Sequence, residues 1–253
     1  MINFKEKIVS ILTLILTSFK DENDIVPPKI FFTPTLQNYK EVIEPNFLLY
    51  VSNSMLIVIG TILLSLLISL PAAYAIAFFN KKNIFFWFVT TNLLPPVAVI
   101  VPVYIIFNRL SILDTKLSLI FLYLGIGIPL MIWLITTFFK DIPMEIIEAA
   151  DVDGSSRLNT FFKIIFPLTK TGIVSSALLV FIFVWNEFFF AMSLTYNNAP
   201  TIPVYTSKYM TQQGFFWGKM SAASTIAIII PVIVGILSQR TFIKGLTMGA
   251  IKE

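Results

Sequence analysis

Five apolar stretches, each long enough to cross a lipid bilayer, decide what this chain of 253 residues can fold into. They cover residues 48–77, 84–107, 117–139, 173–195 and 221–238. A transmembrane helix needs about 20 apolar residues, and lipid offers the backbone no hydrogen-bond partner outside a helix or a closed barrel. Strand-like alternation is absent from these stretches, so the sequence predicts an all-α, polytopic membrane protein.

A shorter apolar stretch, residues 8–19, precedes the five. At about 1.5 Å per residue it spans roughly 18 Å, less than a hydrocarbon core of about 30 Å. It follows a basic start, as the core of a signal peptide does, but no small-residue cleavage site comes after it. We therefore predict a short or truncated first transmembrane helix, and six transmembrane helices in all.

The distribution of Lys and Arg predicts the orientation in the membrane. With the N-terminus inside, the cytoplasmic segments hold 11 of the 18 basic residues, which the positive-inside rule favours. Both termini, the loop of residues 140–170 and the tail of residues 239–253 are then cytoplasmic, whereas residues 196–220 form an extracytoplasmic loop. The net charge of +4 reflects these topology-setting residues, so we expect no nucleic-acid partner.

Two residue types are missing from the sequence, which contains no cysteine and no histidine. Disulfides, thiol chemistry, histidine general bases and histidine-based metal sites are therefore excluded. We expect no catalytic site and no metal site in this chain.

A polar island at residues 141–154 interrupts a chain that is 57% hydrophobic and 13% charged. Pro143 is compatible with the first turn of a helix, and Asp141 can cap that helix. Glu145 and Glu148 suit the positive end of the helix dipole. A polar loop of this kind in a membrane protein predicts contact with a soluble partner, and an ordinary amphipathic connector is the alternative.

The end of the island helix is also marked in the sequence. Ala149 and Ala150 offer a smooth surface that another backbone can approach, and Gly154 supplies the turn that ends the helix. Ser155 or Ser156 can cap a second helix, which lies against the membrane or the bundle and which Pro167 closes. The apolar positions of this second helix recur at helical spacing: Leu158, Phe161, Phe162 and Ile165.

The residues from Glu148 to Pro167 resemble the EAA loop of ABC importer permeases. The matching pattern is Glu148-Ala149-Ala150, three residues, Gly154, nine residues, Ile164, one residue and Phe166-Pro167, with Phe166 in place of the usual leucine. In that family, the helix of this loop docks in a cleft of the ATPase subunit and carries its motion to the membrane helices. The resemblance implies that eight residues couple this chain to an ATPase: Glu145, Glu148, Ala149, Ala150, Asp153, Gly154, Ile164 and Pro167.

Two further stretches, Val184 to Thr195 and Gln239 to Lys252, look like the smaller permease subunit of maltose-type sugar importers. Asn53-Ser54 and the placement of the prolines match the same layout, so the resemblance covers essentially the whole chain. It implies a single transmembrane permease domain over residues 1–253, with a type I importer fold in a bacterial inner membrane. The sequence departs from the family at the N-terminus, where the family's first helix is fuller.

The resemblance implies a permease subunit of an ATP-driven, binding-protein-dependent sugar importer. Its partners would be a second homologous permease, an ABC ATPase dimer, an extracytoplasmic solute-binding protein, membrane lipid and the sugar. No nucleotide-binding signature is present. We therefore expect a transport subunit that is not an enzyme, with no cofactor of its own and with ATP and Mg held by the ATPase. Two alternatives remain open: the same machinery for another solute such as glycerol phosphate, and a channel or secondary transporter.

Asn186 and Glu187 lie close to the centre of the fifth apolar stretch, residues 173–195. An ionised carboxylate at that depth costs several kcal/mol unless it faces water or a partner. The two residues are therefore candidates for the translocation path. The alternative is a structural hydrogen bond to a neighbouring helix.

Overall fold

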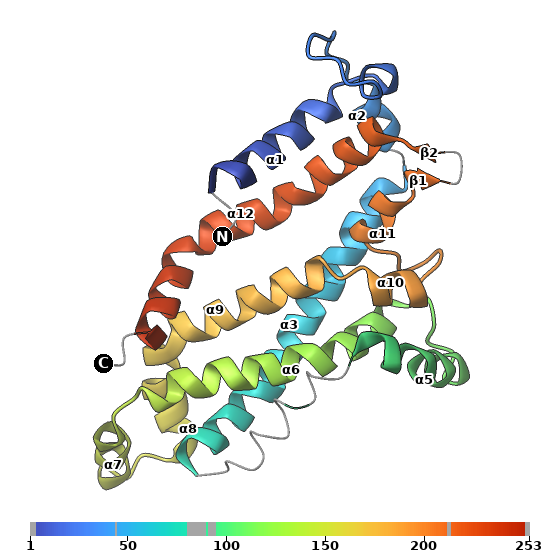
Figure 1. The fold of residues 1–253 in the computed structure, drawn as a ribbon. Helices are drawn as coiled ribbons and strands as arrows, with labels where there is room; N and C mark the ends of the chain where they lie inside the picture. Colours follow the sequence, from blue (N-terminus) through green and yellow to red (C-terminus); the bar gives the residue numbers. More distant parts are fainter. Residues whose placement is uncertain (1–3, 44, 80–89, 91–94, 212–213, 251–253) are drawn as a thin grey trace. The chain divides into compact units, whose positions relative to one another are not determined.

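The computed structural model describes residues 4–43, 45–79, 90, 95–211 and 214–250, and most of these are helical (Figure 1). The elements in chain order are α1 (Phe4–Ser18), η1 (Glu22–Asp24), α2 (Gln37–Val42), α3 (Phe47–Phe78), α5 (Pro96–Arg109), α6 (Lys116–Lys140), α7 (Met144–Val152), α8 (Arg157–Thr160), η2 (Phe161–Ile165), α9 (Phe166–Trp185), α10 (Phe189–Leu194), α11 (Ile202–Ser207), β1 (Met210–Thr211), β2 (Gly214–Phe215) and α12 (Trp217–Ala250). The two strands form only a short antiparallel hairpin, and the other elements in this list are helices. The predicted helical class is therefore confirmed.

Among the described residues, four helical segments are long and apolar enough to cross a membrane: α3, α6, Arg157–Trp185 and Trp217–Gln239. Two apolar helices are shorter, Ile8–Ser18 within α1 and all of α5, which confirms that the first predicted span is short. The second predicted span, residues 84–107, falls partly outside the described residues, so the count of six stays a prediction. The helix α12 continues to Ala250, so most of residues 239–253 are helical, and their cytoplasmic placement stays a prediction.

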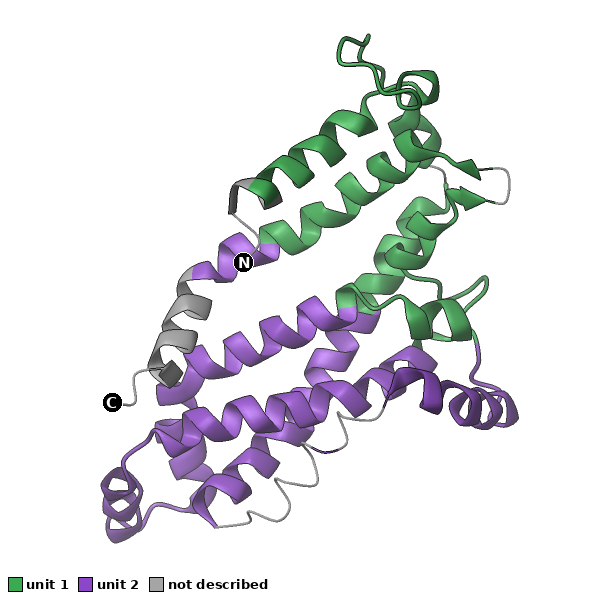
Figure 2. Cartoon of the chain, viewed as in Figure 1, with its two compact units in different colours: residues 1–56, 114–116, 185–233 green, residues 57–113, 117–184, 234–253 purple. Residues whose placement is uncertain are grey.

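The chain divides into two compact units (Figure 2). Unit 1 contains residues 1–56, 114–116 and 185–233, and unit 2 contains residues 57–113, 117–184 and 234–253. The single permease domain over residues 1–253 stays a prediction.

The core of unit 1 gathers short segments from both ends of the chain. Its buried members are Val42, Phe47, Tyr50, Ile202, Tyr205, Ala222 and Ala223. The Tyr205 hydroxyl donates a hydrogen bond to the Val42 carbonyl at 2.6 Å, which supplies the partner that a buried phenol needs. The two alanines let α12 come close to these aromatic side chains.

The core of unit 2 forms where α3, α6 and α9 approach one another at Gly127. A Cβ atom on this glycine would lie 2.6 Å from Ser65 Oγ on α3 and 3.5 Å from Val180 Cγ1 on α9. Small residues allow this kind of close helix packing in membranes. The Ser69 hydroxyl also donates to the Ile128 carbonyl at 3.2 Å, which ties α3 to α6.

Pro167 does not close the second helix, contrary to the prediction, because the helix runs on from Arg157 to Trp185. A proline inside a helix lacks the N–H donor and clashes with the carbonyl four residues earlier. The π-helical turn η2 lies just before it, and there the Phe166 N–H donates to the carbonyl of Phe161, five residues back. This wider turn accommodates the proline ring without ending the helix.

Candidate functional site

The polar island folds into α7 with a well-defined end. The helix starts at Met144, and its cap position is occupied by Pro143 and not, as predicted, by Asp141. At the other end the Gly154 N–H donates to the Asp151 carbonyl at 3.1 Å, and the Ser155 N–H donates to the Ala150 carbonyl at 2.9 Å. Gly154 has a φ of +72°, so these bonds form a Schellman motif. The predicted role of Gly154 as the helix terminator is confirmed.

The two faces of α7 differ in exposure. Ile147 and Ala150, three residues apart, are buried, whereas Glu145, Glu148 and Ala149 are exposed. Ala150 therefore lies on the inward face with Ile147, since residues at this spacing share one helix face, and only Ala149 of the two alanines is exposed. The part of Ala150 in coupling stays a prediction. The outer face combines carboxylates with apolar side chains.

The remaining residues of the predicted coupling set follow α7. Asp153 and Gly154 are exposed, Ile164 is half-buried and Pro167 is exposed. The predicted cap is confirmed at Ser156, whose hydroxyl accepts a hydrogen bond from the Asn159 N–H at 3.4 Å.

The apolar face predicted for the second helix is divided in the structure. Ile165 is fully buried and Phe161 is half-buried, whereas Leu158 and Phe162 are exposed. Only part of this helix therefore packs against the bundle.

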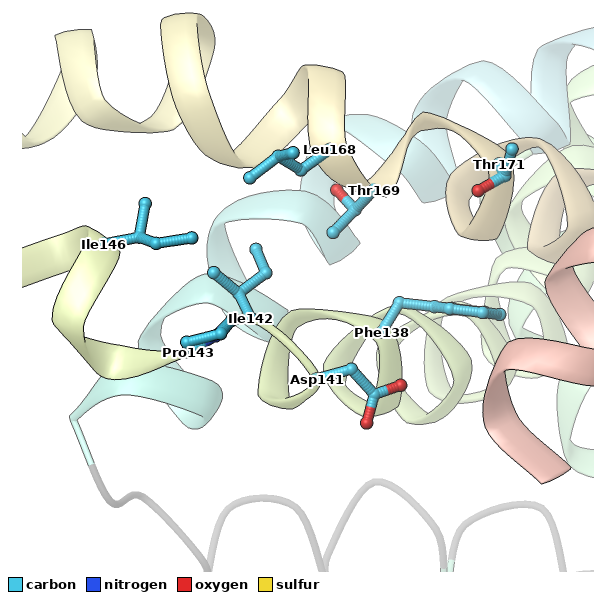
Figure 3. A pocket seen from close by; sticks show the side chains of 8 residues that line it. All are labelled: Phe138, Asp141, Ile142, Pro143, Ile146, Leu168, Thr169 and Thr171. Carbon is cyan, nitrogen blue, oxygen red and sulfur yellow. The ribbon is translucent and has the colours of Figure 1, made fainter. Parts of the chain in front are cut away.

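A cavity of about 480 Å³ lies behind α7, between the end of α6 and the start of α9. Figure 3 shows Ile142, Ile146 and Leu168 pointing into the same space, while the carboxylate of Asp141 turns away from them. Pro143, Ile146 and Leu168 in its lining are exposed, so this cavity is open to the surface and is not a void in the packed interior. The helix α7 therefore has an open, largely apolar groove beside α9.

The fifth predicted span is broken at the two candidate path residues, so the prediction of one continuous helix to Thr195 is wrong. The helix α9 ends at Trp185 and α10 begins at Phe189. The carboxylate of Glu187 accepts hydrogen bonds from the N–H groups of Phe190 at 2.9 Å and Ala191 at 3.1 Å. In a continuous helix these N–H groups would bond to the carbonyls of residues 186 and 187. The side chain replaces those carbonyls, and the helix breaks there.

Asn186 is exposed and lines a cavity of about 300 Å³ in unit 1. Trp185 lies beside it, Pro203 and Thr206 come from α11, and Ser224 comes from α12. The side chains that line this cavity are apolar or neutral and polar, and none of them carries a charge. The structure thus separates the two candidates, because Asn186 faces an open space and the carboxylate of Glu187 caps α10.

Asp114, which no motif in the sequence singles out, organises a loop on unit 1. Its carboxylate accepts hydrogen bonds from four consecutive backbone N–H groups, at 2.8 Å from Tyr196, 3.1 Å from Asn197, 3.0 Å from Asn198 and 3.3 Å from Ala199. Burial acts to raise the pKa of Asp114, but these donors outweigh it and lower the pKa below its usual range. Its isolation was an available signal, since it is the only acidic residue between Glu44 and Asp141.

The same loop is also held by the start of α3. The Asn53 side-chain amide donates to the carbonyls of Asn198 and Pro200, each at 3.1 Å. The Ile202 N–H donates to the Ser54 hydroxyl at 2.8 Å. We refer to residues 196–202 as the Asp114 loop. The Asn53-Ser54 pair that contributed to the family resemblance thus anchors a loop.

Comparison with known proteins places these features in context. Residues 65–243 match the family model described as "Binding-protein-dependent transport system inner membrane component". The chain is 36% identical to the probable ABC transporter permease protein y4oR of Sinorhizobium fredii, over 94% of this chain and 88% of that protein. It is 33% identical to the trehalose/maltose transport system permease protein MalG of Thermococcus litoralis, over 94% and 89%.

A solved structure shares the fold. It is the crystal structure of a bacterial ABC transporter involved in the import of the acidic polysaccharide alginate. The TM-score is 0.71 at 20% sequence identity, and the match covers 96% of this chain and 99% of that chain.

Proposed function

Because the chain belongs to the family of binding-protein-dependent transport system inner membrane components, we propose that it moves a neutral sugar across the membrane and receives the driving motion at α7. The chain is a multi-pass permease subunit of an ABC importer, and this family works with an ATPase and a binding protein. In our proposal the full assembly contains a second homologous permease, two ATPase subunits that hold ATP and Mg, and an extracytoplasmic solute-binding protein. Both termini and α7 face the cytoplasm, and residues 196–220 face the binding protein.

The coupling proposal rests on the shape of α7. Glu145, Glu148 and Ala149 are exposed, and the Schellman motif at Gly154 fixes the end of the helix. The helix can therefore act as a rigid piece in contact with the ATPase. The cavity of about 480 Å³ behind it leaves room for a shift relative to α9.

Two neighbouring alanines give a matched test of coupling in a chain that contains no cysteine. In the assembled transporter, Ala149→Cys should cross-link to a cysteine placed in the cleft of the ATPase, whereas the buried Ala150→Cys should not. Failure at both positions, with the assembly intact, would contradict docking at α7. Uptake that persists after ATP depletion, with the ion gradient held, would favour a channel or secondary transporter.

The solute proposal rests on the cavity beside Asn186. Its amide can donate and accept hydrogen bonds, and the hydroxyl of Thr206, which donates to the Pro203 carbonyl at 2.8 Å, can still accept one. Trp185 contributes an apolar wall, and about 300 Å³ is at the small end of ligand pockets. This neutral lining favours one uncharged sugar ring over an anion such as glycerol phosphate.

Reconstituted vesicles would test the solute proposal with Asn186→Ala and Asn108→Ala. Asn108 is an exposed asparagine of α5, outside both this cavity and the loop proposed to face the binding protein. We expect Asn186→Ala to lower sugar uptake at normal subunit levels, whereas Asn108→Ala should leave uptake unchanged. Equal uptake by both variants, or preferential uptake of glycerol phosphate, would contradict this assignment.

A further inference from the structure

A separate cavity of about 400 Å³ in unit 2 opens between α3 and the start of the helix Arg157–Trp185. Leu67, Leu70 and Tyr74 line it from α3, and Phe161 and Phe162 line it from the other helix. The proposed coupling and solute sites do not use this space. Its wall is almost entirely aliphatic and aromatic, so it has little to offer a hydrogen-bonding solute.

Arg157 supplies the one charged side chain in the lining of this cavity. Its guanidinium lies 4.8 Å from the centre of the Phe79 ring, a cation–π contact that holds the charge in place. In the part of the chain that the structure describes, Arg157 forms no ion pair, not even with Asp151 or Asp153 a few residues earlier. An anion can therefore be bound here without displacing a carboxylate.

The position of the cavity along its two helices places it at the edge of the bilayer. Both walls are helices of membrane-spanning length, and Arg157 is the first residue of its span. Leu158 and Phe162 on the rim are 72% and 63% exposed, which is too much apolar surface to leave in water. An occupant that covers them in the membrane would be apolar on one side and anionic beside Arg157.

We propose that this cavity binds an anionic phospholipid, with an acyl chain against Phe161 and Phe162 and the phosphate at Arg157. Basic pockets between transmembrane helices on the cytoplasmic side are suited to anionic head groups. The planar guanidinium can bind a phosphate through two parallel hydrogen bonds. The bound lipid would touch the loop three residues after Gly154, where α7 joins the membrane helix.

The absence of cysteine allows a direct test with the full-length chain in lipid vesicles. A fluorophore on Leu158→Cys reports lipid at the rim when brominated phosphatidylglycerol or brominated phosphatidylcholine quenches it. We expect phosphatidylglycerol to be preferred over phosphatidylcholine about fivefold. This factor corresponds to the attraction of about 1 kcal/mol between one Arg and an anionic membrane surface. The preference should be lost in Arg157→Gln and should weaken at high salt.

Three controls make the outcome decisive. Arg109→Gln removes an exposed arginine elsewhere in unit 2 and should keep the preference, while Leu70→Trp, which fills the cavity, should reduce quenching by both lipids. Equal quenching by the two lipids, or equal behaviour of Arg157→Gln and Arg109→Gln, would overturn the proposal. A fluorophore shielded from every lipid would overturn it too, because a protein partner would then cover the rim. Loss of the preference in inorganic phosphate at constant ionic strength would indicate a site for free anions and not for lipid.

Discussion

The island loop, residues 141–157, and the Asp114 loop, residues 196–202, are both polar but are built in opposite ways. The bonds that shape the end of α7 join residues three to five positions apart. The bonds that hold the Asp114 loop join residues 82 to 148 positions apart. Local bonds fix the form of a loop, whereas long-range bonds also fix its place. The first loop can therefore move as one piece, and the second cannot move without breaking charge-assisted hydrogen bonds.

Replacing Asp114 by Asn should have the largest effect, because it weakens the long-range hydrogen bonds that hold the Asp114 loop. Asn tolerates the positive φ of +53° at this position, so the change mainly removes the charge and one acceptor oxygen. Hydrogen bonds to charged groups contribute about 1.5–3 kcal/mol each, and we expect a loss of about 2 kcal/mol in the free energy of unfolding. Thermal unfolding of the detergent-solubilised chain should show a Tm lower by roughly 4–8 °C.

Asp21→Asn is the matched control for this change. Asp21 also accepts a backbone hydrogen bond, at 3.0 Å from the Asn23 N–H, but only within its own turn. We expect a much smaller fall in Tm. Equal effects of the two substitutions would mean that the long-range bonds of Asp114 hold nothing in place.

A low pH should weaken the hydrogen bonds of the Asp114 loop, because it protonates the same carboxylate. The pKa of Asp114 is lowered in the fold, so its contribution is complete above the unfolded pKa of about 3.9 and is lost as the pH falls through the folded pKa. The pKa of Glu41 is also lowered, by hydrogen bonds from Lys219 and Gln37, and this residue titrates in the same range. The measurement is therefore the difference in Tm between wild type and Asp114→Asn. It should stay constant above about pH 5 and shrink toward pH 3. A constant difference down to pH 3 would contradict the assignment.

Asn53→Ala removes the second anchor of the same loop and should have a smaller effect. Two hydrogen bonds from its amide are lost, each of about 1 kcal/mol. The Oδ1 atom of Asn53 is buried without a hydrogen-bond partner among the described residues, and its removal offsets part of this loss. We expect a net loss of about 1 kcal/mol in unfolding free energy, read from the Tm, and a larger loss than in Asn197→Ala.

Gly154→Ala should change the conformation of the island loop and leave the Asp114 loop intact. A Cβ atom at Gly154 would meet nothing within 4 Å, so the cost comes from the positive φ alone, about 1 kcal/mol. Gly154→Asn should cost less, and Gly125→Ala, also without a close neighbour but in a helix, should be neutral or stabilising. In the assembled transporter, ATP-driven uptake should fall less in Gly154→Asn than in Gly154→Ala. Normal uptake in Gly154→Ala despite a lowered Tm would show that coupling does not depend on this turn.

Local sequence pattern predicted the elements that depend on composition and neighbours. The stretches 48–77 and 117–139 became α3 and α6 within a residue at each end, because a bilayer-length apolar run has few other solutions. Gly154 could be predicted because the Schellman motif is encoded within six residues.

Features that depend on distant partners or on side-chain geometry could not be predicted from pattern. The partners of Asp114 lie more than 80 residues away in the sequence. The inward turn of Ala150 depends on which helices lie behind α7, and the continuation through Pro167 depends on the π-helical turn η2. The break at Asn186 cannot be read from the pattern, because a carboxylate within an apolar stretch does not show that its side chain caps the next helix.

Ser156→Ala should have the smallest effect. It tests whether the local bonds of the island loop contribute less to stability than the long-range bonds of the Asp114 loop. The hydroxyl accepts a single hydrogen bond at 3.4 Å, and an N-cap of this kind contributes at the low end of its range, about 0.5 kcal/mol. The Ser156 carbonyl still accepts bonds from the N–H and hydroxyl of Thr160, so the helix start keeps its backbone contacts. The Tm should fall by no more than roughly 2 °C, with uptake unchanged. A fall as large as that of Asp114→Asn would mean that this weak cap helps to hold the island loop in place, and the two loops would then not differ in kind.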